Sequence, residues 1–130
     1  MSTINWLAVL TATVSAFILG GLWYGPLFGR AWLRASGLTE ERVASGSRGK
    51  IFGIAFVLDF LAAAVLAPFL GPDATFSFGL AAGAAVGLCW VGTALGVVYL
   101  FEHRPLAHWL VNAGYQFLAF TVMGGILGAW

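Results

Sequence analysis

Four long apolar stretches constrain the fold of this chain more than any other feature. They cover residues 4–28, 51–70, 76–101 and 106–130, and within them Asp59 is the only Asp, Glu, Lys or Arg. A helix needs about 20 mostly apolar residues to cross a bilayer. A spanning strand would be shorter and would alternate polar with apolar residues, and these stretches do not. The sequence therefore predicts an all-α integral membrane protein, a bundle of four transmembrane helices.

Composition agrees with this class. The chain has 130 residues, of which 61% are hydrophobic and 8% charged, whereas about 25% of a soluble domain is charged. The length suits a single transmembrane domain, residues 1–130. No basic residue precedes Arg30, so the first stretch is expected to be a retained helix and not a cleaved signal. The six basic residues form no patch for nucleic acid, and the single Cys89 excludes an internal disulfide framework.

The basic residues predict the orientation of the bundle. In a four-span chain all six fall on one side: Arg30, Arg34, Arg42, Arg48 and Lys50 in the first connection, and Arg104 in the third. Cytoplasmic loops carry such an excess. Both termini are therefore expected on the non-cytoplasmic side of a bacterial inner membrane. The imbalance also argues against small dual-topology transporters and fluoride channels, which need a nearly balanced charge distribution.

The first connection, residues 29–49, is long enough to hold structure of its own. Thr39 can cap a helix, Glu40 and Glu41 favour the positive end of its dipole, and Leu38 can pack on Val43. We expect a short amphipathic helix at residues 40–46 that lies on the cytoplasmic face. A plain solvated linker is the alternative.

Asp59 is the most informative single residue, because it lies near the middle of the second span. A charged carboxylate at the bilayer centre costs about 2.5–3.5 kcal/mol on insertion scales and normally faces the interior of a bundle. Ala55, Ala62 and Ala63 share its helix face, which would let another helix approach. We expect Asp59 to be neutral and hydrogen-bonded, or to bind a proton or a cation. The alternative is a neutral carboxyl group that only ties helices together.

Span four offers polar partners for this carboxyl group. His108, Asn112 and Gln116 are spaced by four and form one stripe, with Tyr115 beside it. At a rise of about 1.5 Å per residue, Asp59 falls between Asn112 and Gln116 in depth, so a contact with one of them is predicted. These five residues are the candidates for binding or transport of a small ion.

A second candidate site lies at the cytoplasmic rim. Arg104 is suited to a lipid phosphate, and His103 or His108 to proton transfer, although Trp, Tyr and Arg also gather at membrane interfaces merely as anchors. The spacing of the two histidines matches no metal site. Because no catalytic triad or phosphate loop occurs either, we expect no catalytic residue, metal or cofactor, and the sequence favours a non-enzymatic role. The candidate rim residues are Trp23, Tyr24, Tyr99, Glu102, His103 and Arg104.

The glycines predict close helix packing. The chain has 18 of them, and GxxxG pairs recur in the third and fourth spans, as at Gly83 and Gly87 or Gly124 and Gly128. Such pairs let backbones approach within one chain or between chains. Four short helices enclose little space, so a pore would need several subunits. The expected assembly is a homo-oligomer in the lipid bilayer.

Two parts of the sequence carry a family resemblance. Residues 22–32, LWYGPLFGRAW, together with Tyr99, Glu102, the 104–106 and 112–115 segments and the last residue, Trp130, resemble a bacterial membrane family, domain of unknown function 1761. The resemblance implies a four-helix membrane protein and brings no established catalytic residues.

Three functions remain open at this point. The first is a homo-oligomeric channel or transporter for a small ion or solute that uses Asp59. The second is a membrane-embedded enzyme or binding protein for a lipid-like hydrophobic ligand at the cytoplasmic rim. The third is an accessory subunit of a membrane complex.

Overall fold

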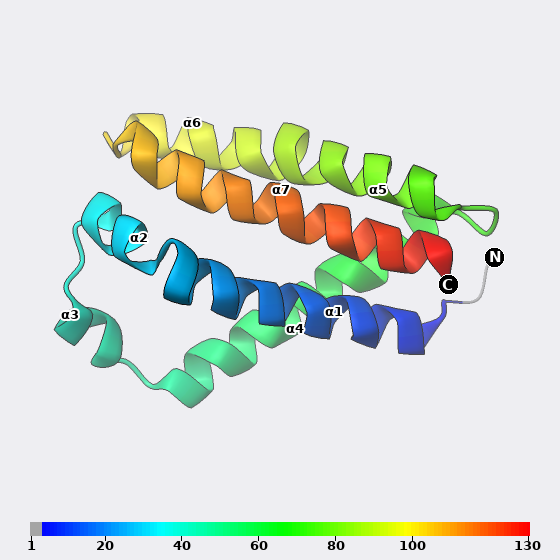
Figure 1. Ribbon diagram of the computed structural model, residues 1–130, viewed down its shortest axis with the longest axis horizontal. Helices are drawn as coiled ribbons and strands as arrows, with labels where there is room; N and C mark the ends of the chain where they lie inside the picture. Colours follow the sequence, from blue (N-terminus) through cyan, green and yellow to red (C-terminus); the bar gives the residue numbers. More distant parts are fainter. Residues whose placement is uncertain (1–3) are drawn as a thin grey trace.

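The computed structural model describes residues 4–130, which form helices and the turns that join them (Figure 1). Four continuous helical stretches, Trp6–Leu27, Arg48–Leu70, Phe76–Phe101 and Leu106–Ala129, are long and apolar enough to cross a membrane. They confirm the all-helical class with four candidate spans and indicate a membrane protein. In order, the helices are α1 (Trp6–Leu22), the π-helix η1 (Trp23–Leu27), α2 (Gly29–Ser36), α3 (Glu40–Ala44), α4 (Arg48–Leu70), α5 (Phe76–Ala85), the π-helix η2 (Val86–Gly92), α6 (Thr93–Phe101) and α7 (Leu106–Ala129).

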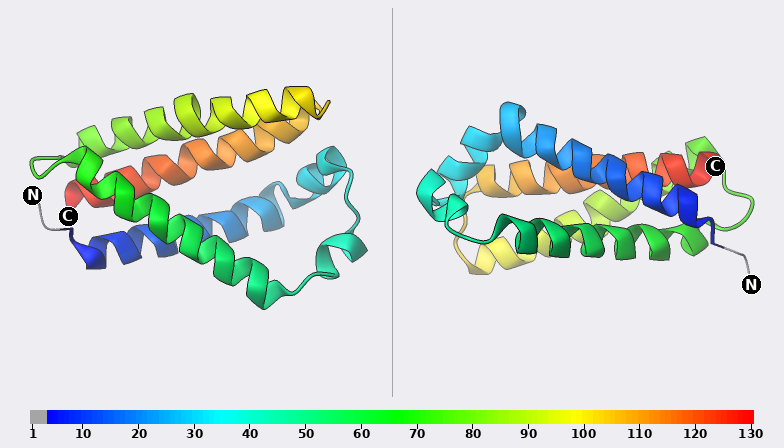
Figure 2. Two further views of the ribbon diagram at one scale, coloured as in Figure 1. Left: turned by 180° about the vertical axis from the view of Figure 1, so that it is seen from behind. Right: turned by 90° about the horizontal axis from the view of Figure 1, so that it is seen from below.

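Helix α7 is the centre of the bundle. The continuous arm α5–η2–α6 lies along one side of α7, α1 lies along the other, and α4 crosses obliquely behind (Figures 1 and 2). The first half of α4 leans away from α7, so that α4 joins the core only through its second half. The core cluster draws Val9, Ala12 and Ala16 from α1, Ala63, Leu66 and Leu70 from α4, and Tyr115, Ala119 and Met123 from α7.

Glycines bring α5 and η2 into backbone contact with α7. A Cβ atom added at Gly79 would overlap the carbonyl oxygen of Gly124, and one added at Gly83 would overlap that of Phe120. The GxxxG pairs of these two spans therefore serve packing within the chain. By contrast, Gly21 and Gly25 of the first span have nothing within 4 Å of an added Cβ. A homo-oligomer stays a prediction.

The first span ends in a π-helical turn. Pro26 has no backbone N–H to donate, and the amide of Phe28 donates to the carbonyl of Trp23 at 2.7 Å. The turn also needs Gly29, because a Cβ there would lie 2.5 Å from the carbonyl oxygen of Tyr24. π-helical turns are rare and are often found at functional sites. Here the turn redirects the chain out of the span and into α2.

The first connection contains two helices where one was predicted. Helix α3 begins at the predicted residue, with the Thr39 hydroxyl accepting from the Arg42 amide at 3.1 Å, but it ends at Ala44. Its amphipathic placement on the membrane face stays a prediction. The sequence analysis missed α2, although Arg30 and Arg34 are spaced by one helical turn there. A glycine in the left-handed region, Gly37 at φ 75°, ends α2.

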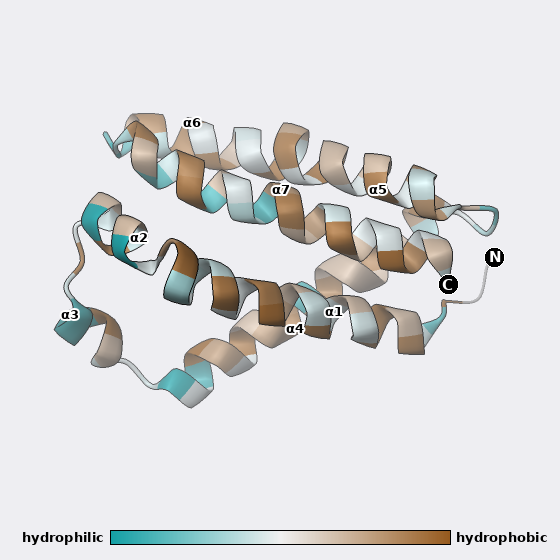
Figure 3. Ribbon diagram, in the orientation of Figure 1, coloured by the Kyte–Doolittle hydropathy of each residue, from teal (hydrophilic) through white to brown (hydrophobic). Residues whose placement is uncertain are grey.

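Hydrophilic residues gather at one end of the bundle (Figure 3). That end carries α2, α3, the first turn of α4 and the connection between α6 and α7, whereas α1 begins and α7 ends at the opposite end (Figure 1). All six basic residues lie on these segments. We call residues 29–50 and 102–105 the basic end. The side of the membrane that it faces stays a prediction.

Candidate functional site

A chain of hydrogen bonds connects three of the four spans. The Tyr24 hydroxyl donates to Oδ1 of Asn112 at 2.7 Å, and Nδ2 of Asn112 donates to the Tyr99 hydroxyl at 2.9 Å. Tyr24 belongs to the first span, Tyr99 to the third and Asn112 to the fourth. Both ends of one amide are therefore used to hold two tyrosines in place. We call these three residues the Tyr–Asn–Tyr chain.

Two predicted site residues flank this chain. The ring of His108 meets that of Tyr99 edge-on at 4.6 Å, and the ring of Tyr115 lies 5.3 Å from that of Tyr24. The Tyr115 hydroxyl donates to the carbonyl of Ala16 at 2.9 Å. His108 is only 8% exposed, and its Nδ1 atom has no hydrogen-bond partner among residues 4–130. The structure thus merges residues that the sequence divided between a midplane site and a rim site.

Three of the other predicted rim residues, Trp23, Glu102 and Arg104, have side-chain partners. The indole N–H of Trp23 donates to the carbonyl of Val111 at 2.9 Å. Arg104 pairs with Glu102 at 3.1 Å and donates from Nη1 to the carbonyl of Ser36 at 3.2 Å, so it ties α2 to the α6–α7 connection. His103 is exposed in that connection, with φ 57°. The bonds of Trp23 and Arg104 join separate segments of the bundle. A ligand-binding role of the rim stays a prediction.

The predicted contact of Asp59 with Asn112 or Gln116 involves no hydrogen bond within residues 4–130. Asp59 is half-buried in α4 and makes no hydrogen bond or ion pair within the described part of the chain, while the Asn112 amide is engaged by Tyr24 and Tyr99. No bond joins Asp59 to Gln116 either, among those same residues; Gln116 lies over η2, its carbonyl oxygen 2.5 Å from a Cβ added at Gly87. The physical reason is that both ends of the Asn112 amide are engaged by the two tyrosines.

An open cleft of about 480 Å³ lies at the basic end, and its charged lining residues Arg30, Glu40 and Arg48 are exposed. It lies between η1 and α2 on one side and α3 and the start of α4 on the other. Tyr24 and Trp32 meet edge-on in its wall, their ring centres 6.0 Å apart. No ion pair engages its charged residues within residues 4–130. The lining consists of Tyr24, Gly25, Gly29, Arg30, Trp32, Leu33, Glu40, Val43, Ala44 and Arg48.

The cleft and the Tyr–Asn–Tyr chain share Tyr24. The Tyr24 hydroxyl is held by Asn112 of the Tyr–Asn–Tyr chain, and Tyr24 also lines the cleft. Guanidinium groups such as those of Arg30 and Arg48 bind phosphate or carboxylate in a fork geometry, and aromatic walls suit an apolar or stacked group. The arrangement is therefore suited to an anionic amphiphile.

Most of the cleft was not predicted from the sequence. Arg30 counted there among the basic residues that indicate orientation, Glu40 among those that begin a helix, and Trp32 among those that carry the family resemblance. What brings them together is the turn at Gly37, which folds α3 back toward η1. The spacing of Arg30 and Arg34 was the one available signal, and it could have revealed α2 but not the cleft.

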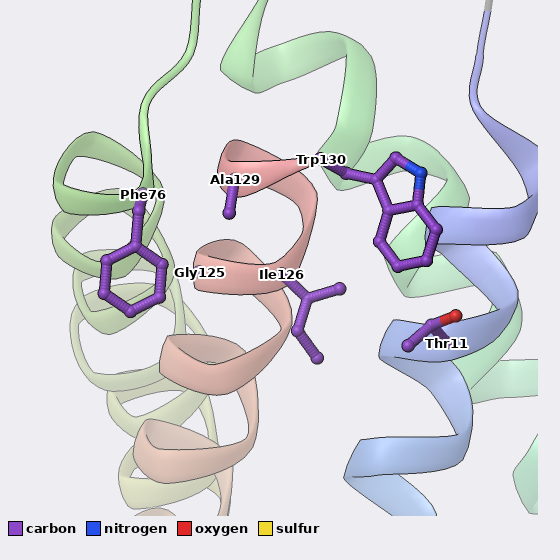
Figure 4. A pocket seen from close by; sticks show the side chains of 6 residues that line it. All are labelled: Thr11, Phe76, Gly125, Ile126, Ala129 and Trp130. Carbon is purple, nitrogen blue, oxygen red and sulfur yellow. The ribbon is translucent and has the colours of Figure 1, made fainter.

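A second hollow, of about 510 Å³, lies at the opposite end of the bundle and has no charged lining. Figure 4 shows Ile126 and Trp130 on the side of α7 that faces Thr11, with Phe76 beyond the helix. The Thr11 hydroxyl is occupied, since it donates to the carbonyl of Leu7 at 2.8 Å. The other polar side-chain group in the lining is the indole N–H of Trp130 (Figure 4). No set of three or more His, Cys, Asp or Glu residues that could hold a metal occurs in the described residues.

Comparison with protein families shows to which family this chain belongs. The family described as "Protein of unknown function (DUF1761)" matches residues 7–128. The chain belongs to the DUF1761 family. Comparisons with curated proteins and with solved structures gave no match. The matched residues of this DUF1761 protein include the whole Tyr–Asn–Tyr chain and the whole lining of the cleft. Since the family description assigns no activity, the function has to be argued from the site.

Proposed function

We propose that this DUF1761 protein binds a phosphate-bearing, lipid-like amphiphile in the cleft at its basic end. One observation carries the proposal: Arg30 and Arg48 line a single cleft beside Tyr24 and Trp32, and neither arginine is paired with a carboxylate within residues 4–130. Charge-assisted hydrogen bonds from arginine to phosphate are among the strong ones in proteins. The aromatic walls would hold the glycerol and the upper acyl carbons.

The lipid chains have a path out of this cleft. Ile51, Phe52 and Ile54 of α4 are all exposed apolar residues, and the first of them lies three residues after Arg48. An acyl chain can therefore run along this part of α4 while the headgroup stays among the arginines. We place the basic end on the cytoplasmic side of a bacterial inner membrane, with both termini on the other side. Anionic lipids attract basic segments at that surface.

Neutralising the two arginines is expected to weaken retention of an anionic phospholipid about tenfold or more. A hydrogen bond to a charged group is worth about 1.5–3 kcal/mol, and about 1.4 kcal/mol corresponds to tenfold. The variant Arg30→Gln/Arg48→Gln would be compared with wild type by native mass spectrometry of protein released from nanodiscs of defined composition.

A matched control exists in the same segments. Arg34 of α2 and Arg42 of α3 lie outside the cleft lining, so Arg34→Gln/Arg42→Gln removes the same charge from the same end. This variant is expected to retain the lipid as wild type does. Equal losses in both variants would reduce the effect to general surface attraction and defeat the proposed site.

We propose transport of a proton or small cation by a homo-oligomer as the second function. It is supported by Asp59, a carboxyl group in the middle of a candidate span that has no hydrogen bond or ion pair within the described residues. Such residues are costly in a bilayer and tend to mark ion pathways. Because backbone contact closes α5 and η2 onto α7, a pathway beside Asp59 would form between subunits.

Substituting Asp59→Asn is expected to abolish proton flux into liposomes that contain the protein and a pH-sensitive dye. The amide keeps the shape of the side chain but cannot exchange a proton. Asp73→Asn, in the exposed turn between α4 and α5, is the control and should leave flux intact. Absence of proton and cation flux with the wild-type protein would exclude this second function.

A further inference from the structure

We infer that the amphiphile bound in the cleft is a phosphodiester whose headgroup carries hydroxyl groups, as a glycerol or other polyol does. The inference rests on the proposed function and adds the headgroup chemistry. It starts from Glu40, a carboxylate that lines the same cleft as Arg30 and Arg48 and forms no ion pair within residues 4–130. Its place in the first turn of α3 favours the helix dipole, and as part of the cleft lining it also borders any ligand that the arginines bind.

Glu40 sets a requirement on the ligand. An ionised carboxylate only accepts hydrogen bonds, so the exposed carboxylate of Glu40 would repel a phosphate group that offers it no donor. A ligand that brings a donor group satisfies it, and a ligand without one is disfavoured. Such a repulsive element is a common means of specificity. Glu40 therefore selects for headgroups that donate.

A headgroup could offer Glu40 either a hydroxyl or an ammonium group as donor, and the charge of the cleft distinguishes between the two. The cleft carries two arginines and one glutamate, which is one positive charge in excess. A phosphodiester with hydroxyl groups carries one negative charge and neutralises this excess. A phosphodiester with an ammonium group is neutral overall and would leave the excess uncompensated. The balance favours hydroxyl groups.

The aromatic wall supports a polyol as well. Trp32 meets Tyr24 edge-on at 6.0 Å, so the cleft has ring surface against which the C–H groups of a polyol can pack. The Tyr24 ring is held in position, because its hydroxyl donates to Asn112 at 2.7 Å and its face packs near Tyr115. A preorganised wall limits the ordering cost of binding.

Three lipids with identical acyl chains test the inference. Phosphatidylglycerol is a hydroxylated phosphodiester, phosphatidylethanol has the same charge without hydroxyl groups, and phosphatidylethanolamine carries an ammonium group. In nanodiscs with equal amounts of the three, wild-type protein is expected to retain phosphatidylglycerol about fivefold or more over phosphatidylethanol. Glu40→Gln is expected to lose most of this preference. Glu41→Gln, next in the chain and outside the cleft lining, is expected to keep it.

Each outcome bears on one claim. Equal retention of phosphatidylglycerol and phosphatidylethanol by wild type overturns the hydroxyl inference and leaves phosphate binding standing, and a preference for phosphatidylethanolamine overturns it in favour of an ammonium group. An unchanged lipid preference in Arg30→Gln/Arg48→Gln defeats the proposed function itself. Deacylated glycerophosphoglycerol, added to protein in detergent, separates the sources: effective competition with the lipid upholds the polyol chemistry but assigns it to a soluble ligand.

Discussion

Gly124→Ala is expected to lower the free energy of unfolding by about 1–3 kcal/mol, the usual cost of an overpacked site. The new Cβ would overlap the carbonyl oxygen of Gly79, and it would lie 3.0 Å from that residue's carbonyl carbon and 3.1 Å from Cα of Gly83. These are backbone atoms of α5, so no side chain can rotate away to make room. The helices would have to separate, at the cost of contacts along their whole interface. Denaturant titration in mixed micelles, followed by circular dichroism, measures the change.

Gly53→Ala is the matched control for this substitution. Gly53 also lies inside a span, in α4, but an added Cβ there has nothing within 4 Å. Alanine has the higher helix propensity, so the control should be neutral or slightly stabilising. Equal stability of the two variants would mean that α5 and α7 do not meet at backbone distance.

The spans could be predicted because they depend only on the local sequence. The length and apolarity of a stretch decide whether it can cross a bilayer, and the predicted 76–101 and 106–130 agree closely with Phe76–Phe101 and Leu106–Ala129. Helix pairing has a different cause. Lipid is as apolar as the bundle interior, so hydrophobic periodicity does not reveal the buried face. Glycines such as Gly83 and Gly124 indicated that backbones approach closely, but not which helix approaches which.

The candidate site was predictable residue by residue but not as an arrangement. Tyr24, Tyr99, His108 and Asn112 stand out as polar or aromatic residues in apolar spans, and the structure brings all four together. The sequence placed them in two separate sites because depth was counted along straight, parallel helices. The spacing of residues along one helix does not show that the Asn112 amide is engaged by Tyr24 and Tyr99, because those partners come from two other spans.

Asn112→Ala is expected to destabilise the bundle by about 1–2 kcal/mol. It removes two interhelical hydrogen bonds, and such bonds average about 0.6 kcal/mol in membrane proteins, with a maximum near 1.7. The loss also frees Tyr24, so the wall of the cleft should become less ordered and retention of an anionic phospholipid should fall. Unfolding titrations and native mass spectrometry on the same variant measure both effects.

Gln116→Ala and a double-mutant cycle make this prediction specific to the Tyr–Asn–Tyr chain. Gln116 lies one turn further along α7 and forms no hydrogen bond with Tyr24 or Tyr99 in the described part of the chain, so its substitution should leave lipid retention unchanged. The double variant Tyr24→Phe/Asn112→Ala should lower the free energy of unfolding by less than the sum of the decreases in the two single variants, because both substitutions remove the same bond. Strict additivity would show that Tyr24 and Asn112 are not energetically coupled. It would contradict the prediction that Asn112 orders the wall of the cleft through Tyr24.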